Sequence, residues 1–365
     1  MTNNNNIVEY DYKYPKIRLG LCCMNITLKY SENVYCSRKK ILSTILKEGL
    51  EPAKKIAIDN IIDLAKMVIW SKNHGISVMR ISSELLVHCT NPEIIKKFGK
   101  AGEDYKNFEF LRPYLEKVGG LAKAYDMRCT SHPGQYVQLG SLKEHVVKNS
   151  IKELAMHVRF FEMMKLNKDS VMVIHVGGTS GNKISAGERF MQTFRNLPDD
   201  IKKYIVLEND EKSFDAQDVL FICNELKVPM VFDIFHYICY KKYHKDQTQM
   251  SIDEMMPGIL ATWKYRNQRP KFHLSEQAPK KPVGSHSLFV NTIPKEFLEI
   301  PTKYNIEVDI MIEAKGKEIA IGRLYKKYPQ LKPEFAEYIQ TELPEKAIKD
   351  LGISEDVLNG CKYEC

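Results

Sequence analysis

The sequence lacks the features that define several classes of protein. No apolar run is long enough to cross a bilayer, and the opening MTNNNNIVEYDYKY lacks the basic and then apolar order of a secretory signal. No CxxC pair occurs among the nine cysteines, and an odd number does not suit a disulfide framework. We found no internal repeat. We therefore expect an intracellular protein with reduced cysteines and no membrane partner, although nuclear, cytoplasmic and virus-encoded proteins are not distinguished.

The composition is that of an ordinary globular chain. Its 365 residues are 44% hydrophobic and 27% charged, which suits one large domain or two smaller ones. The formal net charge of +8 permits a polyanionic partner without demanding one. We expect a disordered, Asn-rich leader over 1–16, a main domain over 17–325 and a helical extension over 326–365.

Short runs of β-branched and apolar residues recur along the chain, and most are separated by stretches with helical periodicity. The eight runs predicted as strands span 17–23, 77–83, 128–133, 171–178, 204–210, 229–235, 271–275 and 309–315. Apolar residues from Val147 to Phe161 repeat at three- and four-residue spacing and predict a helix over 146–165, and a second helix is predicted over 58–75. Strands that alternate with helices form parallel sheets, and eight such units predict a closed (β/α)₈ TIM barrel. An open doubly wound sheet is the alternative.

Histidines and acids gather where six of these runs end. In a (β/α)₈ barrel the chemistry sits at the carboxyl ends of the strands, on one rim. The run VFDIFHY at 231–237 resembles a buried strand but contains an acid and an imidazole, and a buried carboxylate needs an ion pair or a metal. The full set is His132, His175, Glu208, Asp233, His236, His273, His286 and Glu313. A structural role is the better interpretation of any one histidine, but that interpretation does not explain why five of the ten fall on this rim with three acids.

These eight side chains predict a metal centre. They exceed the ligands that one ion requires, so we expect two or three divalent ions. Mn²⁺ is our first expectation, and Zn²⁺ or Mg²⁺ are alternatives that nitrogen and oxygen donors do not separate. Metals about 3.5–4 Å apart typically hold the attacking and the leaving oxygen of a phosphate displacement. Phosphodiester hydrolysis is therefore the leading chemistry.

Several motifs resemble those of the UV damage endonucleases, which are related in fold and metal site to endonuclease IV. They are SHPGQYVQL, VIHVGG, LENDEKSF, FDIFHY, PKFHLSEQ, HSLFV and IEAKGKE, and the resemblance runs from about Ile17 to Leu324. It implies a hydrolase that cuts double-stranded DNA 5′ to UV photoproducts, cyclobutane dimers and 6-4 products, and leaves a 3′-hydroxyl and a 5′-phosphate. It also implies that the eight rim residues bind the metals. We expect a monomer without an obligate protein partner.

Three residues are predicted to be catalytic. Glu208 and Glu313 are the natural carboxylates to bridge metal ions. Lys271 shares a strand face with His273, beside the predicted cations, which would lower the pKa of its amine or favour its carbamylation. We predict a role for Lys271 in the site and leave its chemical state open.

Three further residues are predicted to contact DNA. The resemblance implies that Gln135 and Tyr136 wedge into the duplex at the lesion. A planar ring can replace lost base stacking, and an amide can hydrogen-bond to exposed base edges. Asn25, after the first predicted strand, is a second candidate contact.

Other functions stay open at this point. One is an abasic-site endonuclease of the endonuclease IV type, and another is a sugar isomerase on the same scaffold. A third is a lesion-binding protein that has lost catalysis, although such a protein has no need for eight metal-competent residues. Incision of irradiated and of abasic duplex would separate the two nucleases.

Overall fold

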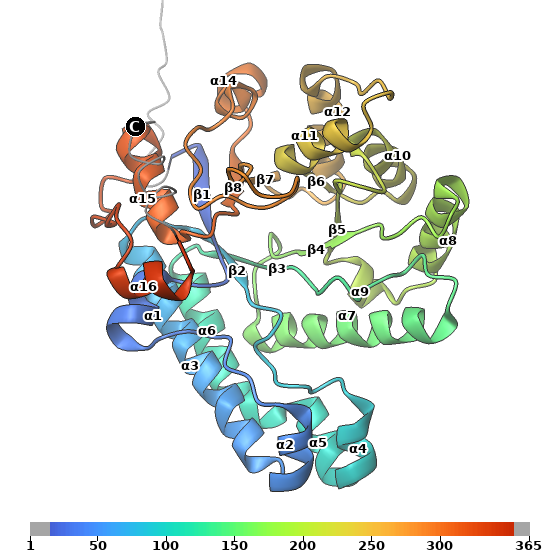
Figure 1. Cartoon of the computed structure of the whole chain (residues 1–365). Coiled ribbons are helices and arrows are strands. Elements are labelled where there is room, and N and C mark those ends of the chain that lie inside the picture. The colour runs from blue at the N-terminus through green and yellow to red at the C-terminus, as the bar shows by residue number, and fades with distance from the viewer. Residues whose placement is uncertain (1–14, 354–365) are drawn as a thin grey trace, which may run out of the picture.

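The computed structural model describes residues 15–353 and contains a closed barrel of eight parallel strands (Figure 1). The strands are β1 (Ile17–Cys22), β2 (Val78–Ile81), β3 (Arg128–Ser131), β4 (Met172–His175), β5 (Ile205–Glu208), β6 (Met230–Asp233), β7 (Lys271–Leu274) and β8 (Val308–Ile312). Each strand pairs with the next along the chain, and β8 closes the barrel against β1. The predicted (β/α)₈ barrel is confirmed, and all eight strands lie where the sequence pattern predicts them.

Helices occupy the connections between the strands and surround the barrel. They are α1 (Ile26–Glu32), α2 (Leu42–Glu48), α3 (Glu51–Asn73), α4 (Pro92–Phe98), α5 (Lys100–Asn107), α6 (Arg112–Ala124), α7 (Glu144–Met164), α8 (Lys183–Arg195), α9 (Asp199–Lys202), α10 (Ala216–Leu226), α11 (Ile234–Tyr243), α12 (Ile252–Lys264), α13 (Lys295–Leu298), α14 (Ile300–Tyr304), α15 (Glu318–Lys327) and α16 (Glu345–Asp350), with 3₁₀ turns η1 (Glu109–Leu111) and η2 (Pro329–Leu331). Figure 1 shows α3 beside α6, with α2, α4 and α5 gathered at their far end. Within residues 15–353, no helix combines the length and the apolar character needed to cross a bilayer.

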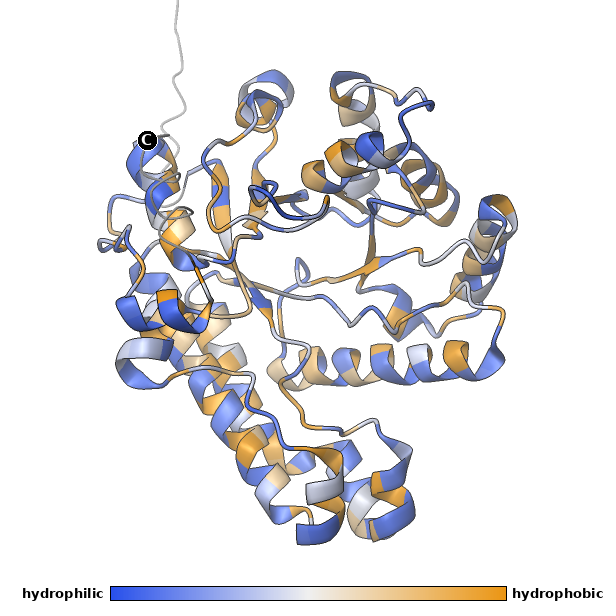
Figure 2. Cartoon of the chain, viewed as in Figure 1, coloured by the Kyte–Doolittle hydropathy of each residue, from blue (hydrophilic) through white to orange (hydrophobic). Residues whose placement is uncertain are grey.

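Local sequence signals explain the bounds and the buried faces of the longest helices. The helix predicted from residue 58 begins earlier, at Glu51, because Pro52 lies in the first turn, where its missing N–H costs no hydrogen bond. The helix predicted over 146–165 is confirmed as α7, whose Leu154, Val158 and Phe161 are buried along one face. Figure 2 shows the corresponding alternation of apolar and polar stripes along α7.

The strands separate two cores. Alternate side chains of a barrel strand point outward to the helices or inward to the barrel interior. The inward side chains form apolar clusters apart from the main helix-covered core: Val171, Val173, Val206 and Val231 with Trp263, and Cys22, Val78 and Met311. At the amino-terminal end of the barrel, away from the polar rim at the carboxyl end, Asp309 forms ion pairs with Arg18, Arg128 and Arg269.

Every strand is shorter than the run predicted for it, and one of them passes directly into a helix. The sequence predicts a strand over 229–235, but β6 ends at Asp233 and α11 begins at Ile234. The Asp233 carboxylate accepts a hydrogen bond from the backbone N–H of His236 at 2.8 Å and caps that helix. His236 therefore lies in the first turn of a helix, directly after the strand. The division into domains at residue 325 stays a prediction, and the predicted leader falls almost wholly outside the described residues.

Candidate active site

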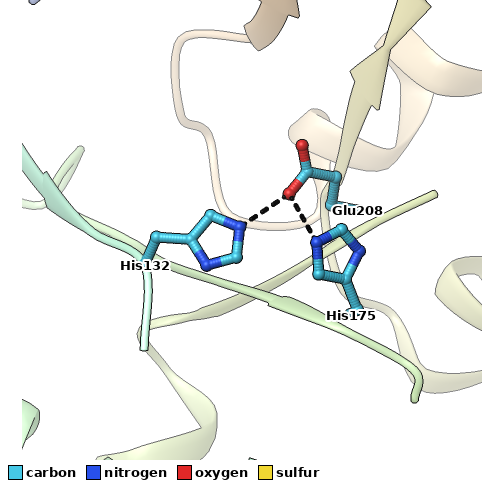
Figure 3. A group of neighbouring side chains, drawn as sticks. All are labelled: His132, His175 and Glu208. Carbon is cyan, nitrogen blue, oxygen red and sulfur yellow. Dashed lines mark hydrogen bonds and ion pairs between the residues drawn. The ribbon is translucent and has the colours of Figure 1, made fainter. Parts of the chain in front are cut away.

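Glu208 lies at the centre of the polar rim. It ends β5 and is 1% exposed. Its Oε2 lies 2.9 Å from His132 Nε2 and 3.4 Å from His175 Nε2, so both rings point at one oxygen (Figure 3). Its Oε1 contacts His273 Nδ1 and lies 4.0 Å from His236 Nδ1. One buried carboxylate thus faces four imidazoles from four elements of the rim.

Two groups of side chains bring candidate metal-ligand atoms within 4.8 Å of one another. The first group is His132, His175 and Glu208, and the second is Glu208, Asp233, His273 and Glu313. Glu208 belongs to both, so its carboxylate is shared by the two groups. Glu313 belongs to the second group alone.

The two remaining predicted ligands, His236 and His286, lie at the edge of these groups. The ring centroids of His175 and His236 are 5.5 Å apart, and His236 Nε2 lies 4.0 Å from Glu211 Oε2. His286 Nδ1 lies 2.8 Å from the backbone oxygen of Glu313 and 3.9 Å from its carboxylate. Glu211 is not among the predicted ligands, although it lies in the same LENDEKSF motif as Glu208.

Unpartnered buried atoms test whether these residues fit a metal centre. Asp233 is 0% exposed, and neither its Oδ2 nor His175 Nδ1 has a hydrogen-bond partner in the described structure. Burial raises the pKa of Asp233, since a charged carboxylate loses its hydration there. A divalent cation would supply the missing partner. The nitrogen and oxygen donors, with no thiolate among them, fit Mn²⁺, Zn²⁺ or Mg²⁺.

The protonation of three of the imidazoles also suits metal ligation. Burial lowers the pKa of His132 to about 4, and it lowers the pKa values of His175 and His273 as well. At neutral pH these rings keep a free lone pair, which is the form that binds metals. For His236, burial opposes the charge, but Asp233 and Glu208 outweigh it and raise the pKa to about 10. The carboxylates around His236 therefore attract positive charge to this part of the rim.

Two basic side chains lie beneath the candidate ligands. Lys271 is fully buried, and its Nζ contacts His273 Nε2. Burial, followed by the cations Arg80 and Arg128, lowers the pKa of Lys271 to about 7. Arg80 Nη2 lies 3.1 Å from His273 Nε2 and contacts the Glu313 carboxylate. Arg80 is absent from the predicted site, although a single cation within the apolar run SVMRISS is the same kind of signal that Asp233 gives.

Comparison with known proteins assigns the chain to a family. The sequence profile of the family described as UV-endonuclease UvdE matches residues 17–344. The chain belongs to this family. It is 38% identical over 314 residues to a provisionally named UV-damage endonuclease of Acanthamoeba polyphaga mimivirus, covering 86% of this chain and 91% of that protein. It is 36% identical over 321 residues to the UV-damage endonuclease of Schizosaccharomyces pombe, covering 87% of this chain and 51% of that protein, about half its length. The crystal structure of SacUVDE matches 86% of this chain and 100% of that chain with a TM-score of 0.71 and 30% identity.

Two of the three predicted DNA contacts of this UvdE family member are exposed, and the third is buried. Tyr136 is 82% exposed, and its neighbour Gln135 is exposed beside it on the loop after β3. A cavity of about 510 Å³ is lined by residues of both this loop and the rim, among them Arg80, His132, Gln135 and His175. Asn25, by contrast, is 0% exposed, and its side-chain oxygen accepts a hydrogen bond from Leu28 N at 2.8 Å, which caps α1. Its contact with DNA stays a prediction, and its buried position does not favour it.

Proposed function

We propose that this protein cuts double-stranded DNA 5′ to UV photoproducts, cyclobutane dimers and 6-4 products, and leaves a 3′-hydroxyl and a 5′-phosphate. Two relatives are named UV-damage endonucleases, which supplies the substrate class. The observation that carries the proposal is the position of Glu208, which is shared by two ligand groups beside a cavity and an exposed aromatic loop. The net charge of +8 suits a polyanionic substrate.

The eight predicted rim residues are the proposed metal ligands. Two or three divalent ions held there, Mn²⁺ first and Zn²⁺ or Mg²⁺ as alternatives, would stabilise the charge that develops on the phosphate and its leaving oxygen. Glu208 orients His132 and His175 toward one point, and their low pKa values keep both rings neutral. Lys271, with a pKa of about 7, can exchange a proton at neutral pH or react with CO₂ to form a carbamate.

Lesion recognition is assigned to Gln135 and Tyr136. The Tyr136 ring would replace base stacking that is lost at the lesion, and the Gln135 amide would bond to exposed base edges. A distorted lesion costs less to unstack than an intact step, so one loop can accept several kinds of damage. The loop stands between two cavities, of about 510 Å³ and about 310 Å³, which leave room on both sides of the inserted residues.

Metal-dependent nicking tests this proposal. Chelator-stripped protein is expected to leave a labelled duplex with one cyclobutane dimer intact, and added Mn²⁺ is expected to restore a single cut 5′ to the dimer. Zn²⁺ and Mg²⁺ are compared under the same conditions, with undamaged and abasic duplexes as controls. Cleavage of the abasic strand alone would reject the lesion assignment and favour an abasic-site endonuclease. Lesion binding without any cut would favour a protein that has lost catalysis.

Substitution of Tyr136 tests the lesion probe. Because stacking of a base on an aromatic ring contributes about 1–3 kcal/mol, Tyr136→Ala is expected to lower incision of dimer duplex by about 10-fold or more. Incision is measured at enzyme concentrations below saturation. The matched control is Tyr338→Ala, at a tyrosine that is 72% exposed, and it should cut as wild type does. Equal rates for Tyr136→Ala and wild type would remove Tyr136 from the proposed interface.

A further inference from the structure

The side chain of Gln138 ties the probe loop to the neighbouring strand end. Gln138 Nε2 donates a hydrogen bond to the backbone oxygen of Gln135 at 2.9 Å. Gln138 Oε1 accepts one from the backbone N–H of Gly178 at 3.1 Å. Gly178 lies in the loop after β4, close to the candidate ligand His175. One amide therefore links the residue that precedes Tyr136 to the rim that carries the candidate metal ligands.

The backbone around Gln138 is shaped to hold this amide. Gly177 has a φ of +108°, and a Cβ at this position would lie 2.4 Å from Gln138 Oε1, so a residue larger than glycine would displace the side chain. The backbone N–H of Gln138 donates to Ser150 Oγ at 2.8 Å. Ser150 Oγ in turn lies 2.8 Å from the Val146 oxygen of α7 and 3.4 Å from the Tyr136 oxygen. The loop is thus fixed to a long helix on one side and to a strand end on the other.

We propose that Gln138 is a positioning residue, which holds the loop in the conformation that presents Gln135 and Tyr136 to a lesion. This inference rests on the proposed function, because it concerns the residues assigned there to the duplex. An exposed side chain binds more tightly when its backbone is already ordered, since less conformational freedom is lost on binding. Gln138 restricts the backbone of the loop through hydrogen bonds at both ends of its amide, although it is not itself one of the two probe residues.

A double-mutant cycle in the full-length, Mn²⁺-loaded chain tests the inference. Single-turnover incision of dimer duplex is measured against enzyme concentration, which separates the half-saturation concentration from the maximum rate. Since one to two hydrogen bonds are lost, Gln138→Ala is expected to raise the half-saturation concentration by about 10-fold and to leave the maximum rate unchanged. In the Tyr136→Ala background the same change should have a clearly smaller effect than about 10-fold, because one of the two probe residues that Gln138 holds in place is gone.

Two further variants separate positioning from a general loss of stability. Gln138→Glu keeps the acceptor for Gly178 but cannot donate to the Gln135 oxygen, and it is expected to bind at least as weakly as Gln138→Ala. Gln192→Ala, at an exposed glutamine of α8, is the matched control and should behave as wild type does. A fold that was merely less stable would lose active protein and maximum rate, without the dependence on Tyr136.

The outcomes distinguish this inference from the function on which it rests. Wild-type enzyme that shows no preference for dimer duplex would overturn both. If wild type prefers the dimer duplex, but Gln138→Ala has the same 10-fold effect with and without Tyr136, the inference alone is wrong. A Gln138→Glu variant that equals wild type would also overturn it, since the bond to Gln135 would then have no effect.

Discussion

Glu208→Gln is expected to lower the rate of dimer incision by at least about 10³-fold, because it removes the charge that organises both ligand groups. Glutamine has nearly the same shape, so the change tests charge rather than volume. The carboxylate presents one oxygen to His132 and the other to His273, whereas an amide can present an oxygen to only one of them. A neutral side chain at the shared position should also reduce the number of Mn²⁺ ions bound per chain. Both quantities are measurable, one by single-turnover incision and the other by metal analysis of the dialysed protein.

Glu188→Gln provides the matched control for this prediction. Glu188 is exposed on α8, so the same loss of one negative charge should leave incision and metal content unchanged. A Glu208→Gln variant that keeps full metal content and more than about a tenth of the wild-type rate would remove Glu208 from the centre of the mechanism.

The sequence predicts the barrel and most of the rim because both depend on local patterns. The strands are short β-branched runs, and polar residues at their ends stand out against apolar neighbours. Glu208, Asp233 and His273 follow this pattern and lie together in the structure. Parallel strands of a barrel bring their carboxyl ends to one rim. Residues that are far apart in sequence can therefore be predicted to lie together, even when no contact between them is known.

Features that depend on contacts between distant segments do not follow from the same patterns. Whether Asn25 faces DNA or caps a helix depends on the packing of α1, and burial selects the cap. The hydrogen bond between the Gln138 side chain and Gly178 depends on the distance between two loops, which a sequence does not give. The charged residues at the amino-terminal end of the barrel belong to this class too, since Arg18 and Asp309 lie 291 positions apart and still form an ion pair.

Asp309→Asn is expected to lower the free energy of unfolding by about 3–5 kcal/mol, because it leaves buried cations without their counter-charge. Asp309 is 0% exposed at the end of the barrel opposite the candidate active site. Arg18 bonds to both of its oxygens, at 2.7 and 3.1 Å. Arg128 Nη1 lies 2.8 Å away, and Arg269 Nε lies 3.1 Å away. An asparagine would keep the volume but leave three guanidinium groups facing a neutral amide.

The pH dependence of stability gives this prediction a second measurement. Burial alone would raise the pKa of Asp309, but Arg18, Arg269 and Arg128 outweigh it and hold that pKa well below its usual range. The unfolded chain, with an aspartate pKa of about 3.9, then binds the proton more readily, so the stabilisation is present above about pH 4 and is lost as the pH falls. Urea unfolding should therefore show a smaller loss of stability between neutral and acid pH in Asp309→Asn than in wild type.

Asp126→Asn is the matched control, because the Asp126 carboxylate also lies near Arg18, at 3.4 Å, but is 71% exposed. Exposed ion pairs contribute at most about 1 kcal/mol, so this variant should unfold almost as wild type does. If Asp309→Asn lowered the free energy of unfolding as little as Asp126→Asn does, the guanidinium groups would have to reach solvent or another acceptor. The buried carboxylate would then not be what stabilises this end of the barrel. If Asp309→Asn greatly lowers the free energy of unfolding while the protein that remains folded cuts DNA at the wild-type rate, then one end of the barrel stabilises the fold and the other carries catalysis.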